Sequence, residues 1–181
     1  MRNKINDNGM LLIKSFEGCR LKSYPDPASP LATELRRPIN ARRPGWENLS
    51  GDPWTVGWGS TGIDTFAVGP DGKFLPIGPN TSWTQEQADK RKADDLQSFC
   101  ISVSKMLKVE VNDNQFAALV SFAYNVGVGN LRTSSLLRLV NQRDFSAAAN
   151  EFMRWTKAQK KELPGLVKRR EVERRLFLTP V

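Results

Sequence analysis

The chain has 181 residues, of which 39% are hydrophobic and 9% aromatic, so it is long enough to form one domain with its own core. Its 27 Lys and Arg outnumber 19 Asp and Glu, and the net charge of +8 favours polyanionic partners such as nucleic acid, acidic membranes or cell-wall polymers. The sequence contains no histidine. This excludes Ser-His-Asp and Cys-His catalysis and most zinc sites, and leaves acid–base chemistry mainly to carboxylates.

Cysteine content and the N-terminal segment bear on the compartment. Cys19 and Cys100 are too few for a disulfide scaffold, and we expect both to be free thiols. The longest apolar run near the N-terminus, MLLI, is much shorter than the apolar core of a signal peptide or a membrane span. We therefore expect cytoplasmic accumulation without a signal peptide.

The first predicted element is a helix over residues 6–17, which Asn6 or Asp7 can cap. Glu17 ends this helix, where the helix dipole disfavours a carboxylate anion, and Asp26 follows in a polar loop framed by prolines. Two carboxyl groups whose surroundings favour opposite protonation states suggest a catalytic acid and base. The structural alternative is that Glu-Gly after a helix and Asp-Pro in a turn are both common pairs.

Residues 19–83 are rich in glycine and proline and predict a small, irregular antiparallel sheet. Asp71-Gly72 indicates a hairpin turn within it. Residues 27–53 contain four arginines and five prolines, which rules out a central strand and predicts a long surface loop. We expect this loop to be a mobile insertion rather than a rim that adds phosphate or peptide contacts, because surface loops tolerate added length at little cost.

Residues 84–178 have the spacing of helices. Thr84 and Gln87 form a predicted capping box, two short helices are expected to meet near Asp144, and Pro164 falls in the first turn of the last helix. The predicted fold class is α+β, with an N-terminal helix and a small antiparallel β lobe packed against a mainly helical C-terminal lobe. We expect one domain over residues 1–181, with lobes of about 1–83 and 84–181.

The last predicted helix is heavily basic, with Leu166, Val172, Leu176 and Phe177 interleaved. Their spacing is typical of a core-facing stripe, which favours a packed helix with its basic face in solvent. The alternative is that this helix engages an anionic surface such as the bacterial outer membrane.

Several segments together resemble the phage-type lysozymes, the endolysins of tailed phages. The segments that carry the resemblance are FEGCRLKSYPD, TVGWG, TQEQADKRKADDL, QFAALVSFAYNVGVGNLRTSSLLRLVN and PGLVKRREVERRLF. They cover nearly the whole chain in the order found in that family. The resemblance implies a lysozyme-like fold.

The implied activity is that of an inverting muramidase, which hydrolyses the β-1,4 bond between N-acetylmuramic acid and N-acetylglucosamine in peptidoglycan. By resemblance, Glu17 protonates the leaving oxygen, Asp26 positions or activates water, and Thr55 helps to hold that water. The resemblance implies no metal and no cofactor. It also implies release to the periplasmic wall through a holin-type pore, and we expect a monomer without a nucleic-acid partner.

Further residues are weaker candidates for the site. Tyr124 and Asn125, near the end of a core helix, are expected to contact sugar, and Trp58 is expected to stack on it; simple packing explains each about as well. Arg169 or Arg170 is a candidate for steadying the catalytic glutamate, although an arginine on a basic helix is usually solvated.

The sequence departs from the family pattern in two places. Residues 27–54 separate Asp26 from Thr55, where shorter members have a tight loop, and Ser60 stands where many members have a histidine. A lytic transglycosylase remains an alternative, although it needs no partner aspartate and Asp26 and Thr55 stand at the family's positions. From a different class, a basic non-catalytic protein that binds the cell wall or nucleic acid also remains open.

Overall fold

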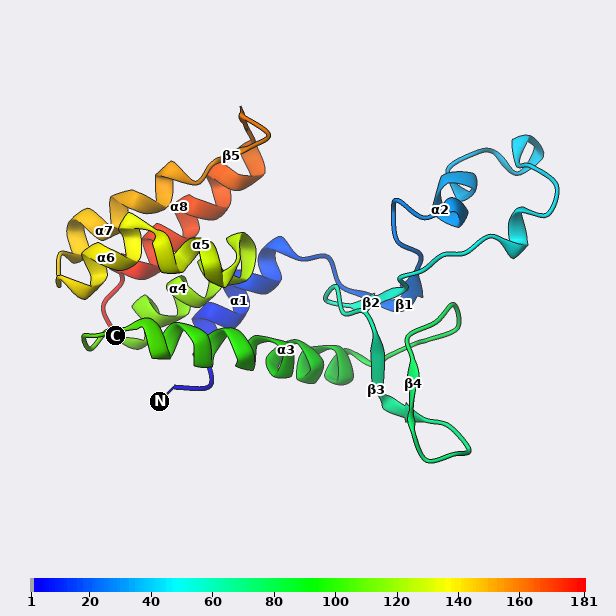
Figure 1. The fold of residues 1–181 in the computed structure, drawn as a ribbon, viewed down its shortest axis with the longest axis horizontal. Helices are drawn as coiled ribbons and strands as arrows, with labels where there is room; N and C mark the ends of the chain where they lie inside the picture. The colour runs from blue at the N-terminus through cyan, green and yellow to red at the C-terminus, as the bar shows by residue number, and fades with distance from the viewer. Residues whose placement is uncertain (1) are drawn as a thin grey trace. The chain divides into compact units, whose positions relative to one another are not determined.

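Two groups of elements make up residues 2–181, the part of the chain that the computed structural model describes (Figure 1). The helical unit consists of the residues up to Phe16 together with Ala93–Val181, and the β unit is Glu17–Lys92. Helix α3 (Gln85–Met106) contributes residues to both units. The first helix thus belongs with the helices of the second half of the chain. The predicted lobe of residues 1–83 had placed this helix with the β strands.

The helical unit contains most of the helices that the sequence predicted. Its elements are α1 (Asp7–Phe16), the second half of α3, α4 (Asp113–Val126), α5 (Val128–Thr133), α6 (Ser135–Asn141), α7 (Phe145–Glu151), the 3-10 helix η3 (Phe152–Arg154) and α8 (Pro164–Leu178). A short hairpin of β5 (Lys157–Ala158) and β6 (Lys161–Glu162) precedes α8. Asp144 caps α7 by accepting from the amide of Ala147, so the predicted boundary between two short helices is confirmed.

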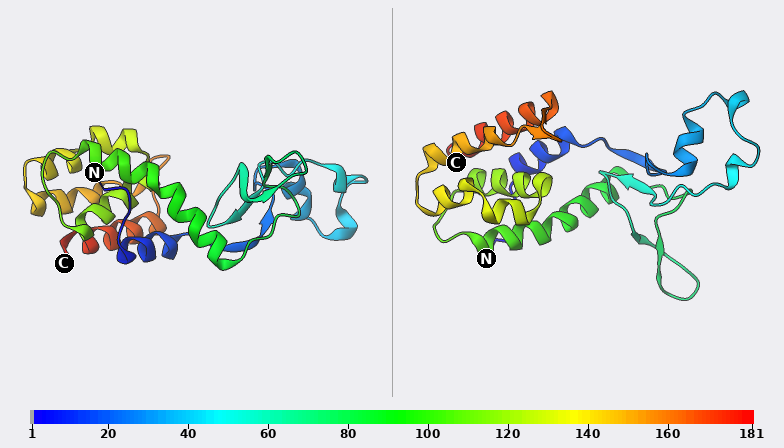
Figure 2. Two further views of the ribbon diagram at one scale, coloured as in Figure 1. Left: turned by 90° about the horizontal axis from the view of Figure 1, so that it is seen from below. Right: turned by 45° about the horizontal axis from the view of Figure 1, so that its top comes forward.

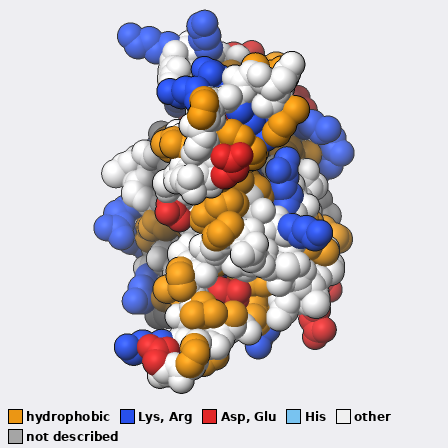
Figure 3. All heavy atoms as spheres, turned by 90° about the vertical axis from the view of Figure 1, so that its right-hand side faces the viewer, with side chains coloured by type: hydrophobic (Ala, Val, Ile, Leu, Met, Phe, Trp, Pro, Cys, Tyr) orange, Lys and Arg blue, Asp and Glu red, His pale blue; other side chains and the backbone are white. Residues whose placement is uncertain are grey.

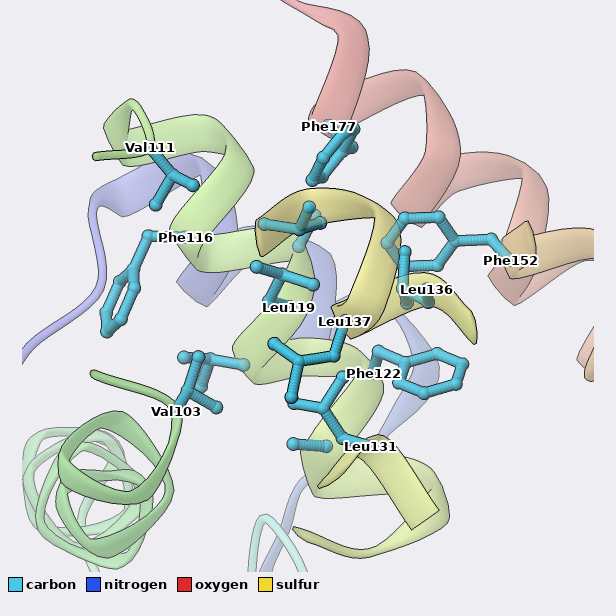
Figure 4. Packing of buried hydrophobic residues seen from close by; sticks show 14 of the residues in the cluster. Val103, Val111, Phe116, Leu119, Phe122, Leu131, Leu136, Leu137, Phe152 and Phe177 are labelled. Carbon is cyan, nitrogen blue, oxygen red and sulfur yellow. The ribbon is translucent and has the colours of Figure 1, made fainter. Parts of the chain in front are cut away.

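The core of the helical unit forms around α4, which packs against α1 and α8. Asn114 and every residue from 116 to 123 are buried in α4, and several of these side chains meet those of α6, η3 and α8 (Figure 4). Phe122 makes edge-to-face contacts with Phe152 and Trp155, with ring centroids 5.5 Å and 5.3 Å away. Trp155 therefore packs against this core.

Helix α8 differs from its prediction in one respect. Pro164 occupies its first turn and Phe177 is buried, as expected for a packed helix. However, Arg169 and Arg170 are also buried, so the expectation that the arginines of this helix are solvated is wrong for these two. The burial of Phe177 favours the packed helix over a membrane-binding one. Among the helices of residues 2–181, none has both the length and the apolar character needed to cross a membrane.

The β unit is built from two antiparallel pairs. Strand β1 (Arg20–Tyr24) pairs with β2 (Thr55–Gly57), and β3 (Ile63–Val68) pairs with β4 (Phe74–Pro76) to form a two-stranded ribbon (Figures 1 and 2). In the turn of this ribbon the Asp71 carboxylate accepts from the amide of Lys73 at 3.1 Å, and Gly72 has a φ of 76°. The predicted Asp-Gly turn is therefore confirmed. Its second position has a left-handed backbone conformation, which glycine adopts without steric cost.

The core of the β unit is small. Val56, Ile77, Trp83 and Ala88 are its buried apolar residues. The Trp83 Nε1–H donates to Asp64 Oδ1 at 3.0 Å, which pairs the one polar atom of the buried indole. Thr84 and Gln87 form the predicted capping box at the start of α3, with bonds of 2.8 Å and 3.1 Å.

The segment between β1 and β2 contains helices, whereas the sequence predicted a long surface loop; that this insertion is mobile stays a prediction. It contains α2 (Pro30–Leu35) and the 3-10 helices η1 (Ile39–Ala41) and η2 (Trp46–Asn48). The Glu34 side chain is fully buried and accepts from Arg43 Nε at 2.6 Å, while Arg37 lies 3.7 Å away. The hydrogen bond from Arg43 holds the pKa of Glu34 below its ordinary value. As predicted, no strand forms among the described residues 27–53.

Candidate active site

Glu17 and Asp26 lie just beyond the two ends of β1. Helix α1 ends at Phe16, one residue earlier than predicted, so Glu17 is the first residue after the helix. The strand begins three residues later. Asp26 follows the last residue of β1 by two positions. Both side chains are half-buried. One short strand therefore links the two carboxyl groups that the sequence singled out.

The Asp26 carboxylate is oriented by its own loop. Its Oδ1 accepts from the backbone N–H of Ala28 at 2.6 Å. The backbone of Asp26 is also fixed, because its N–H donates to the Gly51 carbonyl and its carbonyl accepts from Ser29, both at 2.9 Å. Since Gly51 closes the insertion, the folded insertion helps to determine where Asp26 lies.

Thr55 is buried at the start of β2 and lies opposite Tyr24 in the antiparallel pair. Tyr24 is the last residue of β1, two positions before Asp26. The pairing of β1 with β2 thus returns Thr55 to the end of β1 where the Asp26 loop begins, despite the long insertion between them.

A pocket of about 520 Å³ opens beside Glu17. Its lining consists of Glu17, Gly18, Arg20, Tyr24, Pro25, Pro27, Ala32, Leu35, Arg36 and Gly59. Glu17 and the two prolines that flank Asp26 therefore contribute to one concave surface. On the face of the molecule drawn in Figure 3, Lys and Arg side chains are dispersed around apolar ones. A concave site with one acid and several hydrogen-bond donors suits a polar, sugar-like ligand better than an apolar one.

The phage lysozyme family model matches residues 41–173. The chain belongs to the phage lysozyme family. The matched range includes Thr55 and begins after Glu17 and Asp26, so the assignment of the two carboxylates depends on the geometry above and on the FEGCRLKSYPD motif.

Relatives and solved structures agree with this family. The chain is 42% identical to an endolysin of Bacillus phage B103 over 97% of its own length and 54% of that protein. It is 33% identical to an endolysin of Acyrthosiphon pisum secondary endosymbiont phage 1, over 96% of this chain and 97% of the relative. The chain spans about half the length of the two Bacillus phage endolysins it matches.

Solved structures establish the fold. A P22 lysozyme variant aligns with a TM-score of 0.75 and 29% identity, covering 99% of this chain and all of that one. The muramidase domain of SpmX from Asticaccaulis excentricus aligns with a TM-score of 0.71 and 30% identity, with the same coverage. The predicted lysozyme-like α+β fold is confirmed.

The weaker site candidates of this phage lysozyme chain each have a structural partner. Trp58 packs against the small core of the β unit, and its Nε1–H donates to Asp89 Oδ1 at 2.6 Å. Tyr124 and Asn125 belong to the helical unit. The Tyr124 ring makes an edge-to-face contact with Phe99 at 5.4 Å, and the exposed Asn125 accepts through Oδ1 from Arg170. Helix α4 ends one residue after Asn125, with Gly127 as its cap at a φ of 93°.

Sequence reasoning missed a buried ionic network on α8. Glu173 accepts from Arg169 Nε at 3.2 Å and lies 3.1 Å from Arg170 Nε, and Ser121 Oγ donates to it at 2.7 Å. Burial raises the pKa of Glu173, and Arg170, Ser121 and Arg169 each oppose that shift. Arg169 and Arg170 precede Glu173 by four and three residues, so all three side chains lie on one face of the helix. This spacing is the sequence signal that could have indicated the ion pairs.

Acidic clusters and cysteines are the remaining groups that could carry metal or thiol chemistry. Within residues 2–181 no group of three or more His, Cys, Asp or Glu side chains is arranged to hold a metal ion. Cys19 and Cys100 are free thiols, as predicted. Burial raises the pKa of Cys100 to about 11, so this thiol stays protonated and unreactive near neutral pH.

Proposed function

We propose that this chain is a muramidase that hydrolyses the β-1,4 bond between N-acetylmuramic acid and N-acetylglucosamine in bacterial peptidoglycan. The observation that carries the proposal is the pocket of about 520 Å³, to which Glu17 and both neighbours of Asp26 contribute. Membership of the phage lysozyme family supports the same reaction class.

In the proposed reaction Glu17 donates its proton to the glycosidic oxygen as the bond to the anomeric carbon breaks. A water molecule attacks that carbon from the opposite face and loses a proton to Asp26. The backbone N–H of Ala28 donates a hydrogen bond to Oδ1 of Asp26, so Oδ2 is the oxygen proposed to accept the proton of the water. Thr55, held in β2, is proposed to steady the water. This is the inverting scheme, which needs carboxyl groups about 6.5 to 9.5 Å apart.

Three side chains are proposed to contact the sugar chain. Trp58 offers part of a half-buried ring, which its bond to Asp89 holds in place. Asn125 offers an exposed amide that Arg170 orients. Tyr124 is half-buried against Phe99 and is proposed to contribute mainly through its edge. Each is a rigid polar or aromatic group of the kind that orients a bound sugar.

The setting of this activity is host lysis. We propose that the protein acts as a monomer on the periplasmic cell wall after release through a holin-type pore, with no metal and no nucleic-acid partner. We propose that exposed basic residues of α8 contact the anionic outer-membrane surface. These residues include Lys168, Arg174 and Arg175.

Analysis of the cleaved ends of purified peptidoglycan tests the reaction class. A hydrolase produces N-acetylmuramic acid with a free reducing end, whereas a lytic transglycosylase produces a 1,6-anhydro end. We expect reducing ends only, with the α-configuration appearing first if water attacks from the opposite face. Anhydro ends would establish the transglycosylase alternative, and no cleavage would favour a non-catalytic wall-binding protein.

A further inference from the structure

The four arginines of the insertion have different contacts. Arg37 and Arg43 both pair with the buried Glu34, at 3.7 Å and 2.6 Å. Arg42 donates to two backbone carbonyls of the insertion, and its guanidinium lies 4.3 Å from the ring centroid of a tryptophan in it. These three arginines stabilise the insertion itself. Arg36 is the one of the four that lines the pocket beside Glu17.

The position of Arg36 is fixed at the edge of that pocket. Its Nη2 donates to the carbonyl of Pro27, which also lines the pocket. Arg20, on β1, lines the pocket as well, and its guanidinium carbon lies 4.7 Å from the ring centroid of Tyr24. Two guanidinium groups, one from the insertion and one from the strand, thus border the same space as Glu17.

The charge of the pocket favours an anionic group of the ligand. Among the described residues that line it, Glu17 is the one acid, whereas Arg20 and Arg36 each carry a permanent positive charge. Ala32 and Leu35 give part of the wall an apolar surface. The two guanidinium groups that border the pocket therefore outnumber its one carboxyl group.

We infer that this pocket is a carboxylate-binding subsite, in which Arg36 and Arg20 bind a free carboxylate of the peptide stem that N-acetylmuramic acid carries. This inference rests on the proposed muramidase function and adds a substrate preference to it.

The chemistry of peptidoglycan supports this choice of ligand. The sugars of the glycan backbone are neutral, because the lactyl group of N-acetylmuramic acid is joined to the peptide as an amide. Free carboxylates therefore belong to the peptide stems, which are attached next to the bond that a muramidase cleaves. The planar fork of a guanidinium matches a carboxylate in a two-bond arrangement, which a lysine cannot reproduce.

The test compares two forms of one solubilised peptidoglycan. One form is untreated, and in the other the peptide carboxylates are converted to amides with carbodiimide and ammonia. The readout is the ratio of kcat/KM between the two forms, so that a general loss of activity cancels. The variants are Arg36→Ala, Arg36→Lys and Arg20→Ala. The control is Lys73→Ala, which removes an exposed positive charge on the β3–β4 hairpin that pairs with Asp71.

For the wild type and Lys73→Ala we expect kcat/KM to be about 10-fold higher on the untreated form. This is the effect expected from losing one partly exposed hydrogen bond to a charged group. Arg36→Ala and Arg20→Ala should lose most of that preference, and Arg36→Lys should recover only part of it. The inference is overturned if Arg36→Ala keeps the same ratio as Lys73→Ala, or if the wild type cleaves both forms equally well. If the wild type cleaves both forms equally well, the proposed muramidase function still stands. If the wild type cleaves neither form, both the subsite and the muramidase function are contradicted.

Discussion

The guanidinium carbon of Arg169 lies 5.4 Å from the centroid of the Phe16 ring, and Phe16 is the residue immediately before Glu17. Arg169 is itself buried and bonded to Glu173. The end of α1, from which Glu17 leaves the helix, therefore rests on a buried charged residue of α8. This contact joins the end of α1 to the buried ionic network of α8.

Glu173→Gln should destabilise the helical unit by about 3 kcal/mol, because it leaves two buried arginines without a counter-charge. The measurement is the free energy of unfolding from urea titration at pH 7. Glu171→Gln is the matched control, since Glu171 is exposed on the same helix and its loss should change stability by less than about 0.5 kcal/mol. Equal effects of the two variants would show that the network contributes nothing to stability.

Glu34→Gln should loosen the insertion at neutral pH, because the charge that pairs with Arg43 is lost. The pKa of Glu34 is lowered in the folded protein, so its stabilising contribution is present above the ordinary carboxyl range and is lost as pH falls through the lowered value. Hydrogen exchange of the backbone amides in residues 30–48 measures this.

The pH dependence supplies the control for that prediction. Wild type should exchange more slowly than Glu34→Gln at pH 7, and the difference should shrink once the pH falls below about 4. Glu47→Gln, at an exposed position of the same insertion, should match the wild type throughout. A difference between wild type and Glu34→Gln that grows toward acid pH would contradict the assigned charge state.

Asp26→Asn should lower kcat by about 100-fold or more, because the proposed base is lost. The fold of its loop should survive, since an asparagine oxygen still accepts from the N–H of Ala28. Asp71→Asn makes the same chemical change in the β3–β4 turn and should leave kcat unchanged. Wild-type kcat in Asp26→Asn would assign the loop a structural role and favour the transglycosylase alternative.

Local signals in the sequence were sufficient for the helix and turn boundaries. Thr84 with Gln87, Asp144 and Asp71-Gly72 each act within three or four residues, and all three predictions are confirmed. Such signals need no knowledge of what packs against them.

The insertion and α8 show what local patterns omit. Glu34 and Arg43 are nine positions apart and become partners only because the insertion folds back and buries the carboxylate. Arg169 and Arg170 look like solvated charges on a basic helix, since apolar spacing identifies a core face but not a buried ion pair on it. The motif located Glu17 and Asp26, whereas only the structure distinguished Arg36 from the other three arginines of the insertion.

In the proposed mechanism, Glu17 supplies the proton that breaks the glycosidic bond. The most direct test of this step is the rate at which reducing ends are released from purified peptidoglycan by the wild type and by Glu17→Gln, with unfolding curves to verify that both are folded. We predict that the wild type releases reducing ends and that Glu17→Gln is slower by at least about 100-fold at an unchanged stability. A folded Glu17→Gln protein that releases reducing ends at the wild-type rate would contradict this account.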